Sequence, residues 1–146
     1  MSMYQHILVP TDNSDISQKA IAQAVALARA LGSTLHTLSV RDPFPYASVT
    51  EIQTVSPQEF IDAQERIART RVAAVAEACD SAGIACRSHV VEAEHPWEAI
   101  IDCARQHACD LIVMASHGRR GVSALLLGSE TQKVLTHTTI PVLVVR

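Results

Sequence analysis

The hydrophobic positions of this chain fall into two patterns that alternate along its length. Short runs rich in Ile, Leu and Val are typical of strands that are buried on both faces of a sheet. They predict five strands, at residues 5–11, 34–40, 84–91, 111–115 and 140–145. Between them lie stretches with the period of amphipathic helices, at residues 17–31, 57–81, from 96 onward and 129–136. Strict alternation of strand and helix predicts βαβ units and a parallel sheet with helices on both faces.

Details of the pattern refine this picture. Gly32 and Gly83 are expected to end the first two helices, Gly32 in the left-handed conformation. The strand at 84–91 is predicted at a half-exposed edge because its polar and apolar residues alternate, whereas the wholly apolar 111–115 is predicted near the centre. Residues 42–56 form a loop of a length typical of lids or disordered segments. The buried face of the 57–81 helix is predicted to consist of Phe60, Ala63, Ile67, Val75 and Cys79, with the stem of Arg71.

Length and charge narrow the class of protein. A chain of 146 residues fits a single domain spanning residues 1–146. Its formal net charge of −3 gives no reason to expect nucleic acid or an anionic membrane as a partner. No segment approaches the roughly 20 apolar residues that a membrane helix needs, and the first residues lack the basic and apolar regions of a signal peptide. We therefore expect a cytoplasmic protein.

The cysteines and histidines predict no metal site. None of the four cysteines forms a Cys-x-x-Cys pair, and no histidine stands at zinc-finger spacing from them. We expect free thiols that are buried or half-buried. The seven histidines are spread along the sequence and form no cluster in it.

Ligands of open parallel sheets bind beyond the carboxyl ends of the strands, where the strand order reverses. The informative residues are therefore those that follow the strands, at 10–12, 40–42 and 115–118. If the first and fourth strands are neighbours, the loops that follow them converge on one crevice.

The stretch MASHGRRGVSALLLGSETQKV, which joins the fourth strand to the last helix, has features of an anion site. Gly118 permits a sharp turn and a close approach to a ligand. The first N–H groups of the last helix, on Gly128, Ser129 and Glu130, would point at the same place, where the helix dipole favours an anion. Arg119 would bring positive charge to the rim. The stretch matches neither the P-loop nor the dinucleotide fingerprint, and the alternative is that the glycines only form turns and Ser129 only caps a helix.

The sequence resembles the universal stress proteins of the UspA type over nearly its whole length. Its opening, HILVPTDNSDISQKAIAQAVALARALGSTL, and its ending, DLIVMASHGRRGVSALLLGSETQKVLTHTTIPVLVV, are similar to those of the family. The nucleotide-binding branch of the family carries Gly, two residues, Gly, nine residues, then Gly-Ser or Gly-Thr. Here these positions read Ala115, Gly118 and Gly128-Ser129, so the first glycine is replaced and the phosphate end is intact.

The replacement at Ala115 has two possible consequences, because that position lies close to the ribose in the family. An alanine with ordinary negative φ would only crowd the sugar. At a position that needs positive φ, it would cost roughly 1–2 kcal/mol.

The resemblance implies that the ligand is ATP or AMP, and it gives further residues a role. Asp12 would accept a hydrogen bond from ribose or adenine, or lie near a phosphate-bound Mg²⁺. Met114 would flank the adenine ring, and Glu130 is expected to point to solvent, because it would repel a phosphate if it turned inward. The adenine pocket would be lined by Pro10, Thr11 and Val40. The residues predicted to bind nucleotide are therefore Pro10, Thr11, Asp12, Val40, Met114, Ala115, Gly118, Arg119, Gly128, Ser129 and Glu130.

The resemblance also implies a Rossmann-like, five-stranded parallel sheet of order 3-2-1-4-5 and, commonly, a homodimer. The apolar segment from Ile140 to Arg146 supports a dimer by itself. An exposed edge strand of this kind is a liability unless it is paired, and a two-fold axis would pair it with its twin.

The leading hypothesis is a nucleotide-binding stress-response or signalling protein in which ATP or AMP orders the 42–56 loop for an unidentified protein partner. The alternative is a dimeric, stress-related interaction module whose nucleotide site does not function because of Ala115. An adenylate-using enzyme is disfavoured because a Ser-Gly-Gly-x-Asp-Ser-type pyrophosphate loop is absent after the first strand. At most slow ATP hydrolysis is expected: the Gly-x-Ser-x-Gly elbow is absent, and the adjacent side chains of Ser116 and His117 are expected to diverge.

Overall fold

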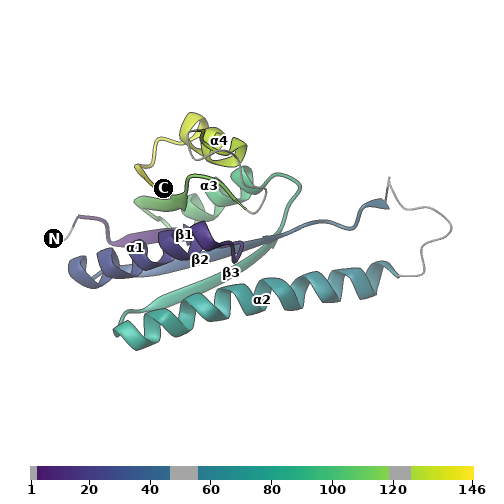
Figure 1. Cartoon of the computed structure of the whole chain (residues 1–146), viewed down its shortest axis with the longest axis horizontal. Coiled ribbons are helices and arrows are strands. Elements are labelled where there is room, and N and C mark those ends of the chain that lie inside the picture. The colour runs from purple at the N-terminus through teal and green to yellow at the C-terminus, as the bar shows by residue number, and fades with distance from the viewer. Residues whose placement is uncertain (1–2, 47–55, 119–125) are drawn as a thin grey trace.

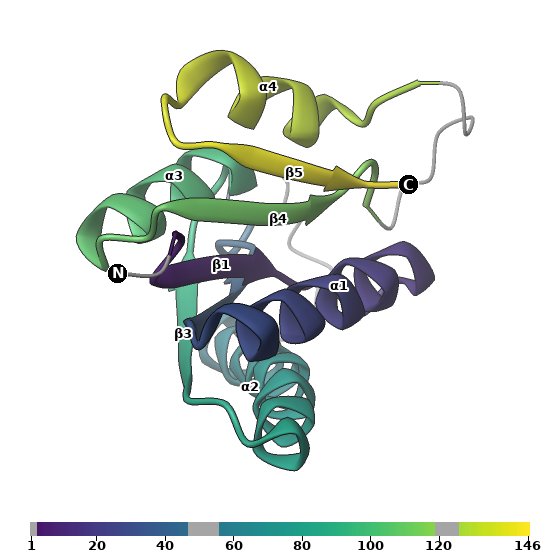
Figure 2. The same cartoon turned by 90° about the vertical axis from the view of Figure 1, so that its left-hand side faces the viewer.

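The computed structural model describes residues 3–46, 56–118 and 126–146. These residues form five parallel strands in the order β3-β2-β1-β4-β5, with helices on both faces of the sheet (Figures 1 and 2). The predicted fold class and strand order are therefore confirmed. In chain order the elements are β1 (His6–Pro10), α1 (Asp15–Leu31), β2 (Thr34–Arg41), α2 (Pro57–Ala82), β3 (Cys86–Glu92), α3 (Pro96–Gln106), β4 (Leu111–Ala115), α4 (Ser129–His137) and β5 (Val142–Val145).

The sheet separates two aliphatic cores. Successive residues of a strand point to opposite faces, so Ile7 and Val9 of β1 pack with α1 and α2, whereas Leu8 packs with α3 and α4. All three side chains are fully buried. The strand β1 thus lies in the middle of the molecule, and its carboxyl end is fixed relative to both helical layers.

The helix boundaries follow the predicted signals closely. Ser14 caps α1, since its hydroxyl oxygen accepts a hydrogen bond from the N–H of Ser17 at 3.2 Å. Gly32 ends the same helix at φ 71°, and Gly83 follows α2 at φ 72°. The left-handed conformation predicted for Gly32 is confirmed. The last strand begins two residues later than predicted, after Pro141, which has no N–H to contribute to a strand pair.

The predicted buried face of α2 is wrong in its first half. Ile67 is 45% exposed, and the residues that pack against the sheet are Ala68, Val72, Val75 and Cys79. From Ala63 to Cys79 the prediction stepped by four residues, and at 3.6 residues per turn each such step rotates the position by about 40° around the axis. The face that is actually buried mixes steps of three and four residues, and it therefore keeps facing the sheet along the helix. None of the helices described in the structure combines the length and apolar character that a membrane crossing requires.

Two hydroxyls on one face of β2 provide a test of this core. The hydroxyl of Thr37 donates to the carbonyl of Val9 at 3.0 Å, whereas that of Ser39 has no hydrogen-bond partner among the described residues. Both residues are fully buried. We expect Ser39→Ala to raise the free energy of unfolding by about 1 kcal/mol, because it removes a buried and unsatisfied hydroxyl, and Thr37→Val to lower it by about 1 kcal/mol. Chemical denaturation of the two variants measures both values, and a larger loss in Ser39→Ala than in Thr37→Val would contradict this description.

Candidate functional site

The loops that follow β1 and β4 converge, as predicted for neighbouring strands at the point where the strand order reverses. A Cβ atom built on Gly118 would lie 3.0 Å from the carboxylate Oδ2 of Asp12. Among the described residues, the glycines with positive φ are Gly32 and Gly83. Gly118 is therefore favoured by the close approach of Asp12, whose carboxylate would have to shift to admit a side chain, and not by a left-handed turn.

The carboxylate of Asp12 has a defined orientation. Its Oδ1 accepts hydrogen bonds from the N–H of Ser14 at 3.0 Å and from the hydroxyl of Ser14 at 2.6 Å. The same hydroxyl caps α1. Asp12 therefore belongs to the polar turn that begins α1 and, through the approach of its Oδ2 to Gly118, to the wall of the crevice.

The first turn of α4 is fixed against the end of β4. The N–H of Gly128 donates to the carbonyl of Ser116 at 2.7 Å, and the hydroxyl of Thr131 donates to the carbonyl of Ala115 at 2.9 Å. A Cβ on Gly128 would lie 3.0 Å from Cα of His117, so only glycine fits here without movement of the backbone. Thr131, which is 2% exposed, was not predicted, because nothing in its sequence context marks it as the anchor of the helix.

This arrangement corrects the predicted set of anion-binding N–H groups. The N–H of Gly128 is occupied by Ser116 and does not point into the crevice as a donor. The N–H groups of the first turn that follow it, from Ser129 onward, have no acceptor within a helix, and no side chain of the cap residue covers them. Ser129 itself is exposed.

The expectation that Glu130 points to solvent is wrong. Its carboxylate accepts a hydrogen bond from the N–H of Trp97 at 2.8 Å, and the residue is half-buried. Trp97 lies in the first turn of α3, whose own cap residue, His95, makes no side-chain hydrogen bond. Glu130 therefore takes the place of a capping side chain for α3, and its negative charge lies at the positive end of that helix.

The remaining predicted residues occupy the strand ends. Ala115 ends β4 and is not among the described residues with positive φ, so the alanine carries no backbone strain. Met114 is 5% exposed and belongs to the core under α3 and α4. The N–H of Thr11 donates to the carbonyl of Leu38 at 2.9 Å. Pro10 and Val40 are half-buried near the ends of β1 and β2, and Arg119 lies outside the described residues.

The side chains of Ser116 and His117 meet, contrary to the expected divergence. The hydroxyl of Ser116 lies 3.2 Å from Nδ1 of His117. The strand alternation that would separate them ends at Ala115, where β4 stops.

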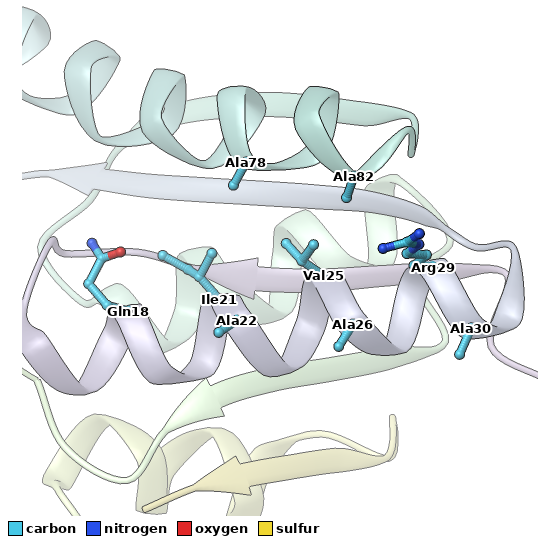
Figure 3. Close-up of a pocket in the computed structure, with 9 residues that line it drawn as sticks. All are labelled: Gln18, Ile21, Ala22, Val25, Ala26, Arg29, Ala30, Ala78 and Ala82. Atoms are coloured by element: carbon cyan, nitrogen blue, oxygen red, sulfur yellow. The ribbon is translucent and has the colours of Figure 1, made fainter.

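Two cavities in the described part of the chain lie on the side of the sheet covered by α1 and α2. One of about 390 Å³ lies beside Asp12 and is also lined by residues of α2, among them Arg66 and Arg71. Another, of about 790 Å³, lies along α1 next to α2, and alanine side chains form most of its wall (Figure 3). It shares no lining residue with the crevice and offers few polar groups, namely Gln18 and Arg29.

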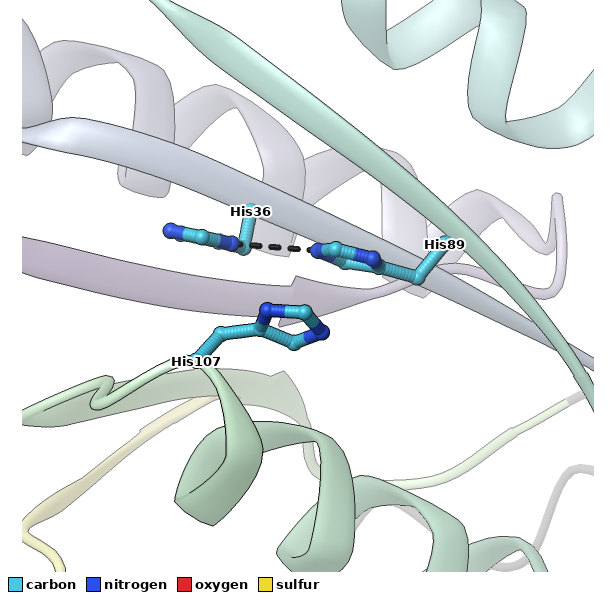
Figure 4. A group of neighbouring side chains, drawn as sticks. All are labelled: His36, His89 and His107. Atoms are coloured by element: carbon cyan, nitrogen blue, oxygen red, sulfur yellow. Dashed lines mark hydrogen bonds between the residues drawn. The ribbon is translucent and has the colours of Figure 1, made fainter.

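Four of the histidines that are scattered in the sequence meet in the fold. His36 in β2 lies at the centre: its Nε2 is 3.1 Å from Nδ1 of His6, and its Nδ1 is 3.1 Å from Nε2 of His89. The ring of His107 stacks on that of His89 with centroids 4.0 Å apart (Figure 4). The sequence did not reveal this cluster because it depends on strand register, which sequence periodicity leaves open.

Burial and neighbouring positive charge keep His36 neutral. Burial, reinforced by His89, His6, His107 and Arg87, lowers the pKa of His36 from 6.5 to about 4. Burial, reinforced by His107 and Arg87, also lowers the pKa of His89.

The cysteines are free thiols, as predicted. Burial raises the pKa of Cys79 and of Cys109 to about 12 and that of Cys103 to about 11. Since the thiolate is the reactive form, these thiols act as apolar core residues.

A parallel sheet of order 3-2-1-4-5 with helices on both faces defines a Rossmann-like domain. The model of the universal stress protein family matches residues 3–146, and the chain belongs to this family. The universal stress protein in the QAH/OAS sulfhydrylase 3′ region of Thermus aquaticus is 33% identical over 144 residues, which cover 99% of this chain and 100% of the relative.

Solved structures share the fold. That of protein MJ0577 of Methanocaldococcus jannaschii superposes with a TM-score of 0.82 at 29% identity, covering 98% of this chain and 96% of that one. A universal stress protein in complex with cAMP has the same fold, with a TM-score of 0.69 at 24% identity, covering 99% and 98% of the two chains.

The buried His36 predicts a stability that depends on pH. Its pKa is about 4 in the folded chain against 6.5 as the ordinary value, so the unfolded chain binds more protons between these limits. Stability is therefore complete above pH 6.5 and is lost as the pH falls toward 4. We expect a loss of about 2 kcal/mol between pH 7 and pH 5, measured by urea denaturation. His36→Asn should remove most of this loss, whereas His95→Asn at an exposed position should retain it; equal stability of the wild-type chain at both pH values would contradict the assignment.

Proposed function

We propose that this protein binds an adenine nucleotide, ATP or AMP, with the phosphates at the first turn of α4 and the adenosine over the ends of β1 and β2. The observation that carries the proposal is the junction of three segments at the switch point. Asp12 approaches Gly118, and the start of α4 is fixed to the end of β4 by the bond between Gly128 and Ser116. The first turn of α4, whose N–H groups after Gly128 have no acceptor within the helix, thus lies beside the loops that follow the two central strands.

The start of α4 has the chemistry of a phosphate site. Its dipole favours an anion by roughly 0.3–1 kcal/mol, and each hydrogen bond to a charged phosphate adds about 1.5–3 kcal/mol. The donors are the first N–H groups after Gly128 and the hydroxyl of Ser129. Arg66 and Arg71, which line the cavity beside Asp12, add positive potential next to the crevice.

Glu130 does not oppose this role. Its carboxylate is directed to the N–H of Trp97 and stabilises the start of α3. The repulsion that an inward carboxylate would exert on a phosphate is thereby reduced.

The adenosine would contact the residues at the strand ends. Asp12 would accept a hydrogen bond from the ribose or lie beside a phosphate-bound Mg²⁺, a cation that prefers oxygen ligands. Because Ala115 carries no positive φ, its methyl group only narrows the space for the sugar. This favours a working site over the alternative, an interaction module whose site is not functional. The stress-related role belongs to the family, and its member with cAMP is an example of a nucleotide bound to this fold.

Two substitutions at Ser129 separate the effects of binding and folding. Ser129→Asp places a negative charge at the start of α4, which stabilises the helix but repels a phosphate. We expect its affinity for ATP and AMP to fall by about 100-fold while thermal stability is unchanged or higher. Ser129→Ala removes one hydrogen bond to a charged group and should cost about tenfold in affinity. Isothermal titration calorimetry measures both.

The control for the Ser129 variants is Gln23→Glu, which makes the same change in net charge on the exposed side of α1. It should bind like the wild-type chain. Equal affinity of Ser129→Asp and the wild-type chain, or no binding of either nucleotide to the wild-type chain, would refute the proposal. Gly128 is unsuitable for this test, because any side chain there meets the backbone of His117.

We also propose that two copies pair through β5. The carbonyl of Pro141 accepts a hydrogen bond from the N–H of Ile112 in β4, and that of Val145 accepts one from Ser116, directly after β4. The alternate residues Val142 and Val144 therefore turn their N–H and C=O groups to the open edge. Leu143 is 41% exposed beside them. A second copy related by a two-fold axis would satisfy these groups and cover the apolar strand.

Val144→Pro tests the dimer, because proline removes one N–H from the open edge and leaves the bonds to β4 in place. We expect size-exclusion chromatography with light scattering to give a dimer for the wild-type chain and a dissociation constant at least tenfold weaker for Val144→Pro. Val144→Ala, which retains the N–H, should remain dimeric. A wild-type chain that is monomeric at high micromolar concentration would rule out the proposal.

A further inference from the structure

The histidine cluster gathers ligand atoms for a metal from three separate elements. His36 lies in β2, His89 in β3, and His107 directly after α3 (Figure 4). One ring nitrogen from each lies within 4.8 Å of the other two. His36 is buried and the other two are half-buried, so the group lies at the boundary between core and solvent.

We propose that His36, His89 and His107 bind a divalent transition metal ion, Zn²⁺ in the first instance. Imidazole nitrogen is a preferred ligand of zinc, at about 2.0–2.1 Å, and three histidines with one open position form a well-known zinc geometry. Two nitrogens of a tetrahedral site at that bond length lie about 3.3 Å apart. Nδ1 of His36 and Nε2 of His89 are already 3.1 Å apart, and a nitrogen of His107 lies within 4.8 Å of the other two ligand atoms. The stacked rings must turn so that all three lone pairs point at one ion.

His6 is placed to orient the central ligand. In the metal-bound form Nδ1 of His36 gives its lone pair to the ion, and its proton moves to Nε2. That N–H then donates to Nδ1 of His6, which lies 3.1 Å away. A ligating histidine commonly donates its other N–H to such a partner, which fixes its tautomer and orientation.

The site has an entry route. A cavity of about 460 Å³ is lined by His89 and His107 together with Cys103, Asp102 and Glu98. The two accessible histidines thus open onto solvent, and a water molecule from this cavity would complete the coordination. The carboxylates at its wall raise the local concentration of cations.

The cluster is separate from the proposed nucleotide crevice. His6 is the first residue of β1, whereas the crevice lies beyond Pro10, the last one. The metal proposal therefore stands or falls independently of nucleotide binding. The competing explanation is a stack of neutral rings joined by hydrogen bonds, in which each contact of 3.1 Å holds a proton and no ion is bound.

Metal titration of the whole chain distinguishes the two explanations. The protein is first treated with a chelator and dialysed, without nucleotide, since phosphates also bind zinc. We expect calorimetry with ZnCl₂ to give one ion per chain and thermal unfolding to shift upward with zinc. His89→Ala and His107→Ala, both at half-buried positions, should each weaken binding at least 100-fold and remove the shift. His6→Asn should weaken binding by about 10–100-fold, as expected for loss of an orienting partner.

The control is His95→Ala, which removes an exposed histidine outside the cluster and should leave binding unchanged. Folding of each variant is checked by circular dichroism, and Co²⁺ absorption of the wild-type chain reports whether nitrogen ligands surround the ion. The proposal is overturned if the chelator-treated wild-type chain binds no stoichiometric zinc. It is equally overturned if folded His89→Ala and His107→Ala variants retain the affinity of the wild-type chain.

Discussion

The position of β1 between β2 and β4 is the constraint on which the rest of this structure depends. Because the chain leaves β1 toward one neighbour and later returns to the other, the loops after β1 and β4 are not separated by a crossing helix. Asp12 and Gly118 meet there so closely that a methyl group on Gly118 would fit only if the carboxylate of Asp12 shifted. Ile7 and Val9 pack into one core and Leu8 into the other, which fixes β1 between the two cores.

The two glycines of the β4–α4 segment serve structure and site together. The backbone of Gly128 packs against His117, and its N–H donates to the carbonyl of Ser116. Gly128 therefore positions the helix without itself donating to a ligand. Gly118 leaves room for the carboxylate of Asp12. Both glycines that match the ligand motif are therefore explained by packing. The argument for a ligand rests instead on the N–H groups at the start of α4, beyond Gly128, which this packing does not use.

Local signals in the sequence predicted the helices and strands. The errors arise where the contacts of a residue depend on how two elements pack against each other. Alternating runs and the glycine after α1 are local, and they were predicted correctly. The buried face of α2 was misjudged because steps of four residues drift around a helix, which left Ile67 exposed. Glu130 was expected in solvent because an inward carboxylate would repel a phosphate. That expectation missed its partner, the N–H of Trp97, which is 33 residues away in the chain. Strand order was inferred from the family resemblance and not from periodicity, which does not encode it.

The histidine cluster shows why composition alone understates the chemistry of this chain. A polar ring that is taken from water into a core must regain its hydrogen bonds or the fold loses stability. His36 does so on both sides, but only with other imidazoles, His6 and His89. Each of these two pairs of facing ring nitrogens needs a single proton between them. An additional proton would place a positive charge in the core. An aliphatic residue at position 36 would fill the same layer as Leu8 and Leu38 without this constraint. Three rings with ligand atoms within 4.8 Å of one another, a fourth ring bonded to the central one and a cavity beside them are the features on which the proposed metal site rests.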